Sequence, residues 1–235
     1  MTLPKVEEIT IEQEMKGLSI LHLSDLHINK KSSVDSIKEL VSLCNKSSAQ
    51  FVVITGDIID CKVKFIKEKL EILNKIEKQT YYISGNHDLF YGFEPLKNCL
   101  KNLICLDNKT EIFEYQNKKI AIGGFSDRFS KFFGIKREEQ KVLKFLQNYE
   151  YAILLAHQPK DYTFALKSNC KLFLCGHTHG GQIYPFHYVV KLSQPFLKGL
   201  HYRDQTAIYV NKGLGYWGIN FRFKANNEIS LLKLR

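Results

Sequence analysis

Five short polar motifs in the chain carry side chains that bind metal ions or transfer protons. Five of the eight histidines belong to them. The motifs are Asp25-Leu26-His27, Gly56-Asp57, Gly85-Asn86-His87-Asp88, His157 and Gly176-His177-Thr178-His179. Carboxylate, imidazole and amide donors without a thiolate suit Mn, Fe or Zn better than Ca, and they disfavour a site for a soft metal. The motifs therefore indicate a centre for divalent metal ions.

These motifs hold more donor groups than one metal ion needs. Two ions roughly 3.5–4 Å apart, joined by a shared carboxylate, would use the whole set. Asp57 is the candidate for the shared carboxylate, because Gly56 before it allows the backbone to approach closely. The sequence therefore predicts a dinuclear centre.

Each motif follows a short apolar run that is typical of a strand buried on both faces. These runs are 18–24, 51–55, 81–84, 152–156 and 171–175, and two more strand-like runs are 120–125 and 207–211. Apolar residues recur at helical spacing over 34–44, 65–76 and 142–149. Strands that alternate with helices predict an α/β fold with largely parallel sheet. The motifs should then converge at the carboxyl ends of the strands.

The composition is that of a globular protein. Of the 235 residues, 44% are hydrophobic and 25% are charged, which excludes a disordered or collagen-like chain. No change of composition divides the chain, so we expect one domain over 1–235. The formal net charge of +10 favours acidic partners such as nucleic acid, phosphorylated metabolites or an anionic membrane surface.

Six cysteines occur without a Cys-x-x-Cys pair, which fits buried, reduced thiols in a cytoplasmic protein. The first residues lack the basic and apolar regions of a signal peptide. No run approaches the roughly 18 apolar residues of a spanning helix. We therefore expect a cytoplasmic protein, at most peripheral to the inner face of the membrane.

The ordered series D-x-H, G-D, G-N-H-D, H and G-H-x-H resembles the calcineurin-like metallophosphoesterase superfamily over Asp25 to His179. The resemblance implies a four-layered α/β/β/α sandwich with its site at the strand ends. It also implies two divalent ions. One would be bound by Asp25, His27, Asp57 and His179, and the other by Asp57, Asn86, His157 and His177. His87 would be the catalytic histidine and Asp88 its orienting partner.

The C-terminal third is similar to a bacterial subgroup of small membrane-associated phosphodiesterases. The similarity rests on 177–182 (HTHGGQ), Pro185, 211–215 (NKGLG) and Arg222. One branch of that subgroup hydrolyses the pyrophosphate of UDP-2,3-diacylglucosamine in lipid A synthesis. The resemblance thus implies hydrolysis of a phosphodiester or pyrophosphate bond in a phosphorylated small-molecule or lipid substrate.

Two alternatives remain open. A nuclease or nucleotide phosphodiesterase of the same superfamily would use the positive charge, although no nucleic-acid-binding module is visible and nucleic acid is not the expected partner. A non-catalytic scaffold with this fold is the other alternative, but scaffolds of this kind have eroded ligand sets. The motifs do not indicate the oligomeric state.

Two aromatic-rich segments, 125–135 and 183–200, follow predicted strands and contain lysine or arginine. They fit contact with an acyl chain or a membrane surface, and they fit core packing equally well. Arg128 and Arg222 are candidate phosphate ligands, with ordinary surface arginines as the alternative. His22 is expected in the core behind the site, and His187 and His201 at the surface.

Overall fold

The computed structural model describes residues 3–168, 170–181, 193–216 and 226–235, and it contains two six-stranded sheets. The first sheet has the strand order β1 (Val6–Ile11), β12 (Ile229–Leu234), β2 (Ser19–Leu23), β3 (Phe51–Ile54), β4 (Thr80–Tyr82), β5 (Ile104–Cys105). The second has the order β10 (Gly199–Arg203), β11 (Thr206–Val210), β9 (Leu172–Cys175), β8 (Tyr151–Leu155), β7 (Lys118–Gly124), β6 (Lys109–Tyr115).

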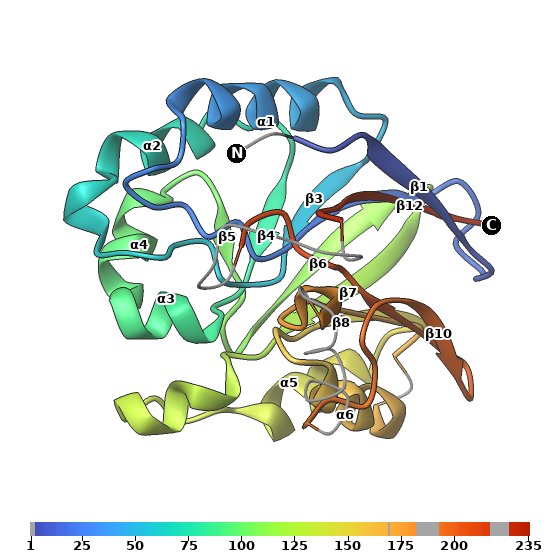
Figure 1. The fold of residues 1–235 in the computed structure, drawn as a ribbon. Helices are drawn as coiled ribbons and strands as arrows, with labels where there is room; N and C mark the ends of the chain where they lie inside the picture. The colour runs from blue at the N-terminus through green and yellow to red at the C-terminus, as the bar shows by residue number, and fades with distance from the viewer. Residues whose placement is uncertain (1–2, 169, 182–192, 217–225) are drawn as a thin grey trace.

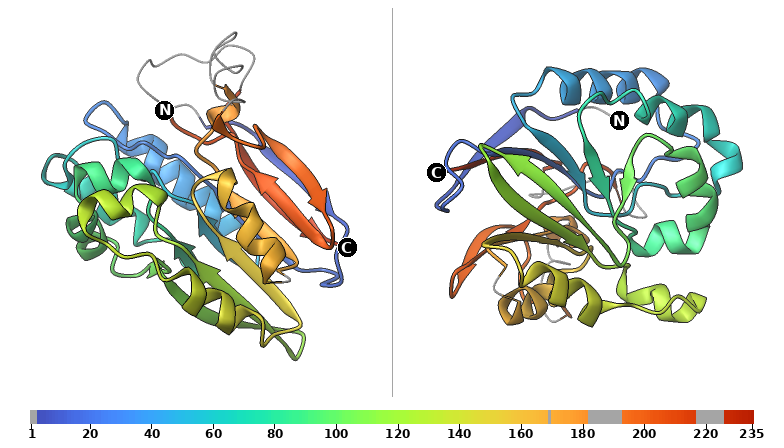
Figure 2. Two further views of the ribbon diagram at one scale, coloured as in Figure 1. Left: turned by 90° about the horizontal axis from the view of Figure 1, so that it is seen from below. Right: turned by 180° about the vertical axis from the view of Figure 1, so that it is seen from behind.

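Helices cover the outer faces of the two sheets (Figures 1 and 2). On the first sheet these are α1 (Val34–Lys46), α2 (Lys67–Leu73) and α4 (Phe93–Cys99), and α3 (Asn86–Tyr91) lies at its edge. The second sheet is covered by α5 (Glu139–Leu146) and α6 (Tyr162–Lys167). The described residues also form four short 3-10 helices, η1 (Val63–Phe65), η2 (Arg128–Phe133), η3 (Pro159–Asp161) and η4 (His179–Gly181). The predicted α/β/β/α sandwich is therefore confirmed.

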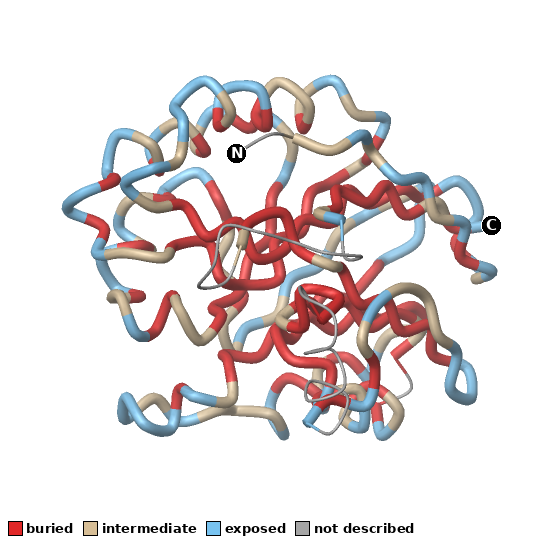
Figure 3. The backbone as a smooth tube through the Cα atoms, in the orientation of Figure 1, coloured by how far each residue is buried: buried red, intermediate tan, exposed pale blue. Residues whose placement is uncertain are grey.

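Three apolar clusters fill the three interfaces between these four layers. Along β3, Val52 and Ile54 pack toward the helices, whereas Phe51 and Val53 pack toward the second sheet. Side chains alternate in this way because successive residues of a strand point to opposite faces of the sheet. The third cluster joins the second sheet to α5 and α6. Figure 3 shows the buried residues concentrated between the layers.

Parallel pairing brings the carboxyl ends of the central strands to one edge of each sheet. The strands β2, β3 and β4 are parallel neighbours in the first sheet, and β7, β8, β9 and β11 in the second. The chain segments after β2 and β3 stay paired beyond the strands, because His27 N donates to Asp57 O and Ile28 N donates to Ile58 O. This pairing fixes the segments that carry the first two motifs.

Local structure differs from the sequence-based expectation at two places. The apolar pattern over 65–76 does not form one helix, because Ile66 lies outside helical geometry (φ −136°) between η1 and α2. Strands β1, β5, β6, β10 and β12 were not predicted; β5 has only two residues, and β1, β6 and β10 expose many polar residues. No helix among the described residues is both long and apolar enough to cross a bilayer.

Candidate metal centre

The sequence motifs meet where the carboxyl ends of strands from the two sheets come together. Asp25 and His27 follow β2, and Asp57 follows β3. After β4, Asn86 and His87 begin α3, while the second sheet supplies His157 after β8 and His177 and His179 after β9. Both sheets are needed, so the site exists only when the sandwich is assembled.

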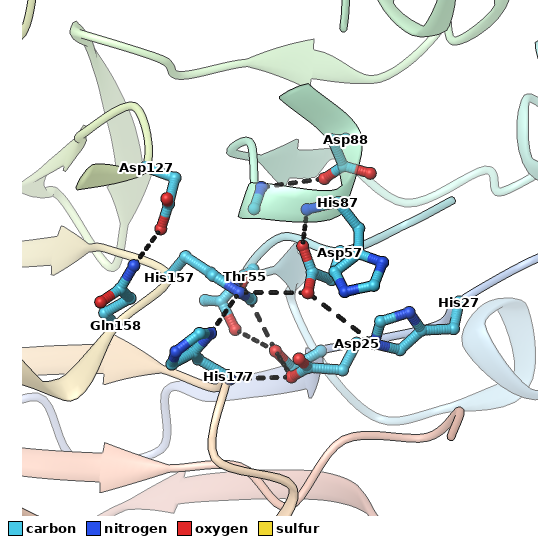
Figure 4. Close-up of polar contacts among 12 residues, drawn as sticks. Asp25, His27, Thr55, Asp57, His87, Asp88, Asp127, His157, Gln158 and His177 are labelled. Atoms are coloured by element: carbon cyan, nitrogen blue, oxygen red, sulfur yellow. Dashed lines mark hydrogen bonds and ion pairs between the residues drawn. The ribbon is translucent and has the colours of Figure 1, made fainter. Parts of the chain in front are cut away.

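Three overlapping groups of donor atoms lie in this site, and Figure 4 shows most of their side chains. Within each group, one ligand atom from every residue lies within 4.8 Å of the others. The first group is Asp25, His27 and His179, the second is Asp57, His157 and His177, and a third, His27, Asp57 and His87, shares residues with both.

Asp57 lies between the first and second groups. Its Oδ2 is 3.3 Å from His157 Nε2 and 3.7 Å from His27 Nε2. Its carboxylate therefore approaches donor atoms of both groups, and the bridging role expected from the sequence stays a prediction.

Several polar atoms of the site have no hydrogen-bond partner among the described residues. Asp25 Oδ1 and Asn86 Oδ1 are buried without one, and such atoms cost free energy unless a cation or water satisfies them. Imidazole nitrogens also approach each other: His27 Nε2 and His179 Nε2 are 3.1 Å apart, as are His157 Nε2 and His177 Nδ1. This oxygen and nitrogen donor set fits divalent ions such as Mn, Fe or Zn.

The backbone at the site is held in an unusual conformation. Asp25, His27, Asp57, His177 and His179 have φ angles of 50°, 46°, 53°, 71° and 50°, in the left-handed region that non-glycine residues rarely occupy. Such conformations cost about 1–3 kcal/mol each and persist where the surrounding structure imposes them. The strain aims the ligand side chains into the site.

Two glycines permit the close packing around these ligands. A Cβ at Gly85 would lie 2.1 Å from Asp57 Oδ1, and one at Gly176 would lie 1.9 Å from Ser24 Oγ. Any side chain at either position would displace the polar groups that form the site.

A chain of buried hydrogen bonds supports Asp25 from behind. His22 Nε2 donates to Thr55 Oγ1 (2.9 Å), Thr55 Oγ1 donates to Ser24 Oγ (2.8 Å), and Ser24 Oγ donates to Asp25 Oδ2 (2.6 Å). Asp25 Oδ2 is therefore occupied, which leaves Oδ1 for a metal ion. Burial lowers the pKa of His22 to about 3, so this histidine is a neutral donor in the core, as the sequence indicated.

Hydrogen bonding fixes the orientation of His157. Its Nδ1 lies 2.7 Å from Thr55 O, which can only accept, so Nδ1 carries a proton. Burial lowers the pKa of His157, but the charges of Asp57 and Asp25 outweigh it and raise the pKa, so Nε2 also carries a proton toward Asp57. A metal ion at Nε2 would replace that proton. Burial opposes charge on Asp57, but His157, His27 and His87 outweigh it and lower the pKa of Asp57.

His87 is oriented by Asp60 rather than by Asp88. The Nδ1 of His87 donates to Asp60 Oδ1 at 2.8 Å. Asp88 instead accepts from Gly85 N (2.9 Å) and from Ile59 N (3.0 Å), so it caps α3 and holds the β3 loop. Burial and the charge of Asp57 raise the pKa of Asp88 to about 8. The expected role of Asp88 is therefore corrected, and Asp60 is the residue that the sequence analysis missed.

Other candidates from the sequence have separate roles. Arg128 is paired with the buried Asp161 (2.6 Å), which Arg137 also contacts (2.9 Å). Phe196 of the segment 183–200 is buried against Tyr162. His201 is half-buried and contacts Lys198 O. The segment 182–192, with Pro185 and His187, and Arg222 lie outside the described residues.

Comparisons with known proteins agree with this geometry. An uncharacterized metallophosphoesterase of Helicobacter pylori is 36% identical over 243 residues, covering 98% of this chain and 64% of that protein. A transmembrane protein with metallophosphoesterase domain from Danio rerio is 29% identical over 99% of this chain and 57% of its own length. The chain thus spans less than two thirds of these curated relatives.

Among solved structures, the NAD nucleotidase of Haemophilus influenzae superposes with a TM-score of 0.59 at 18% identity, over 83% of this chain and 50% of that one. This likeness supports the fold. The family model for calcineurin-like phosphoesterase matches residues 18–181, which include every proposed metal ligand. This chain therefore belongs to the calcineurin-like phosphoesterase family.

Proposed function

We propose that this protein hydrolyses a phosphodiester or pyrophosphate bond with two divalent metal ions. The first ion would be held by Asp25, His27, Asp57 and His179, and the second by Asp57, Asn86, His157 and His177. The observation that carries the proposal is the position of the Asp57 carboxylate between two groups of imidazole and carboxylate donors. When bound, such ions polarise the phosphoryl oxygens and lower the pKa of a water molecule that attacks phosphorus.

His87 supplies the proton for the leaving oxygen. Burial alone would lower the pKa of its imidazole, but the hydrogen bond to Asp60 and the charge of Asp57 raise it. With Nδ1 directed to Asp60, the remaining nitrogen Nε2 faces away from that bond and holds the proton to be donated. Asp60 thereby fixes both the orientation and the protonation of His87.

The cysteines do not provide a nucleophile. All six thiols are free, and burial raises the pKa of each above its ordinary value. A neutral thiol is neither a good nucleophile nor a metal ligand. Direct attack by water, without a covalent intermediate on the protein, is consistent with this property.

The test is metal-dependent turnover of a generic diester. Protein stripped with a chelator should not hydrolyse bis(4-nitrophenyl) phosphate. Activity should return as Mn, Fe or Zn is added and should reach its maximum when two equivalents of metal are bound. Elemental analysis of the reloaded protein gives the stoichiometry. Full metal content without turnover of any phosphate ester would favour the scaffold alternative.

We further propose that the substrate carries an apolar tail and that the protein binds it at a membrane surface. The support is a surface cluster of four phenylalanines, which we call the phenylalanine patch: Phe90, Phe129, Phe132 and Phe133. Their exposed fractions are 56%, 36%, 70% and 42%. Exposed apolar side chains that gather in this way mark contact surfaces.

The phenylalanine patch adjoins the metal centre through α3. Phe90 lies at the end of the helix that begins with Asn86 and His87, and its ring contacts Phe129 (5.8 Å) and Phe133 (5.5 Å) of η2. Lys131 Nζ lies 5.0 Å from the ring of Phe132 and adds positive charge. An acylated sugar nucleotide such as UDP-2,3-diacylglucosamine, hydrolysed on the cytoplasmic side of a membrane, is one substrate of this kind. The Danio rerio relative is a transmembrane protein with metallophosphoesterase domain, which supports this proposal.

A further inference from the structure

A pocket opens beside the metal centre on the side of His27 and Asp60. It has a volume of about 370 Å³, which lies within the range of small-molecule sites. Because His27 is a proposed ligand and Asp60 holds His87, one substrate could place its reacting phosphate at the centre and another of its groups in this pocket. The remaining lining residues are Leu26, Asn29, Lys30, Lys31, Ser32, Cys61, Gly215 and Tyr216.

The loop that forms one wall of the pocket is fixed by hydrogen bonds. The side chain of Asn29 donates to His27 O (3.1 Å) and accepts from Lys31 N (2.9 Å). From α2, Lys69 Nζ donates to Asn29 O (3.0 Å) and Lys30 O (2.8 Å). The wall is therefore built before any ligand binds, and it is tied directly to a residue of the metal centre.

The opposite walls are equally well defined. Asp60 N donates to Ile28 O (3.0 Å), which pairs the segment after β3 with the segment after β2. Gly215 packs so closely that a Cβ there would lie 2.6 Å from Leu26 O. Three chain segments thus line this open pocket.

The charge of the pocket is positive and is not neutralised by carboxylates. Neither Lys30 nor Lys31 has an ion-pair partner within the described part of the chain. Lys30 Nζ instead lies 3.8 Å from the centre of the exposed Phe65 ring, a cation–π contact that does not neutralise its charge. Among the lining residues Asp60 is the one carboxylate, and it is engaged by His87 at 2.8 Å.

We infer that this pocket binds a second anionic group of the substrate, a phosphate or a carboxylate a few atoms from the reacting phosphorus, through Lys30 and Lys31. The inference rests on the proposed hydrolysis at the metal centre and narrows its substrate class to doubly anionic esters. Lys30 and Lys31 are exposed residues of the pocket lining, and ammonium groups of this kind bind an anion by charge-assisted hydrogen bonds. A phosphodiester without a second anion would leave both lysines without an anionic partner.

The first experiment compares three 4-nitrophenyl phosphodiesters of a three-carbon alcohol, whose far end carries a hydroxyl, a carboxylate or a phosphate. The wild-type protein with metals should prefer the anionic esters in kcat/KM. In Lys30→Gln/Lys31→Gln this preference should fall by about 10–100-fold, the value of one or two hydrogen bonds to a charged group. Lys38→Gln on α1, which removes an exposed charge far from the pocket, should keep it.

The carboxylate and phosphate arms identify which anion the pocket accepts. Equal kcat/KM for all three esters in the wild type would overturn the inference while leaving the proposed hydrolysis intact. Failure to hydrolyse any of them would instead contradict the proposed function itself.

The second experiment needs no substitution, because Cys61 lines the pocket and is only half-buried. Propane-1,3-diol bisphosphate should slow alkylation of Cys61 by iodoacetamide, whereas propyl phosphate, which lacks the second anion, should not. Cys99, which is half-buried on α4, serves as the internal control. Equal protection by the two phosphates, or equal protection of both cysteines, would contradict binding in the pocket.

Discussion

The metal centre buries charged side chains, and the phenylalanine patch exposes large apolar ones, so both regions depart from the usual distribution of side chains between core and surface. In the metal centre, Asp25 and Asp57 are almost completely buried, whereas Phe132 of the patch is 70% exposed. Burying charges and exposing large apolar groups both cost free energy. Helix α3 links the two regions, because it begins with Asn86 and His87 and carries Phe90 near its end.

The comparison shows which kind of functional region a sequence reveals. Polar motifs at the ends of apolar runs are conspicuous in the sequence, because burying polar groups beside a strand costs free energy unless the groups are paired. The phenylalanines do not stand out, because the same residues could as well be core. Phe196 is buried and Phe132 is exposed, although both belong to aromatic segments that look alike in the sequence.

The largest effect is expected from Asp57→Asn. The amide removes the charge that serves both donor groups, so bound metal should fall for both ions and activity should be lost. Metal content by elemental analysis and far-UV circular dichroism measure the two properties separately. Asp35→Asn, an equal change of charge on the exposed face of α1, is the control. Two full metal equivalents in Asp57→Asn would end the bridging assignment.

His87→Ala should retain both metals and lose about 10²–10⁴-fold in kcat, the usual range for a general acid. His201→Ala, which removes a histidine outside the site, should behave like the wild type. Loss of a metal from His87→Ala would make His87 a ligand instead.

Asp60→Asn tests whether Asp60 acts through His87. The single change should lower kcat less than His87→Ala does, and the double variant should be no worse than His87→Ala alone, because residues that act as a unit are not additive. An additive loss in this double-mutant cycle would show that Asp60 has an independent role, for example through its 3.9 Å approach to His27.

The fold and the clustering of the motifs followed from the sequence because they depend on local patterns. Apolar runs predicted the central strands, and parallel strands bring their carboxyl ends together. The partner of His87 did not follow, because adjacency in sequence suggested Asp88. Neighbouring residues of a helix do not face each other, so Asp88 points away from His87. Asp60 is brought to His87 by the pairing of two loops, which no local pattern records.

The phenylalanine patch is tested by Phe132→Ser/Phe133→Ser. If these rings enter a membrane, the double change should weaken binding to anionic phospholipid vesicles by about 100-fold, since a buried phenylalanine contributes about 1.5–3 kcal/mol. Sedimentation with vesicles measures the partition coefficient. Ile112→Ser, on the exposed face of β6, should bind like the wild type.

Substrate preference provides a second readout for the phenylalanine patch. The ratio of kcat/KM for an acylated over a deacylated sugar nucleotide should fall in the same double variant. Equal kcat/KM for the acylated and deacylated compounds in the wild-type protein would contradict the proposal that the substrate carries an apolar tail. Loss of folding in Phe132→Ser/Phe133→Ser would show that the rings are structural.

The smallest effect concerns the pH dependence of stability through His22. Its pKa is about 3 in the folded protein, because burial disfavours the charged ring, and about 6.5 in the unfolded chain. The stabilisation is therefore complete above pH 6.5 and is lost as pH falls, because only the unfolded chain binds the proton. From pH 7 to pH 5 this amounts to about 2 kcal/mol. His22→Gln keeps an N–H donor for Thr55 but cannot titrate, so its free energy of unfolding should fall by about 2 kcal/mol less than that of the wild type. Urea unfolding of both proteins, stripped of metal with a chelator, at pH 7 and pH 5 measures this difference. The other histidines titrate in both proteins and therefore cancel in the comparison. Equal losses of stability in the two proteins would show that His22 is not the neutral, buried support of Asp25.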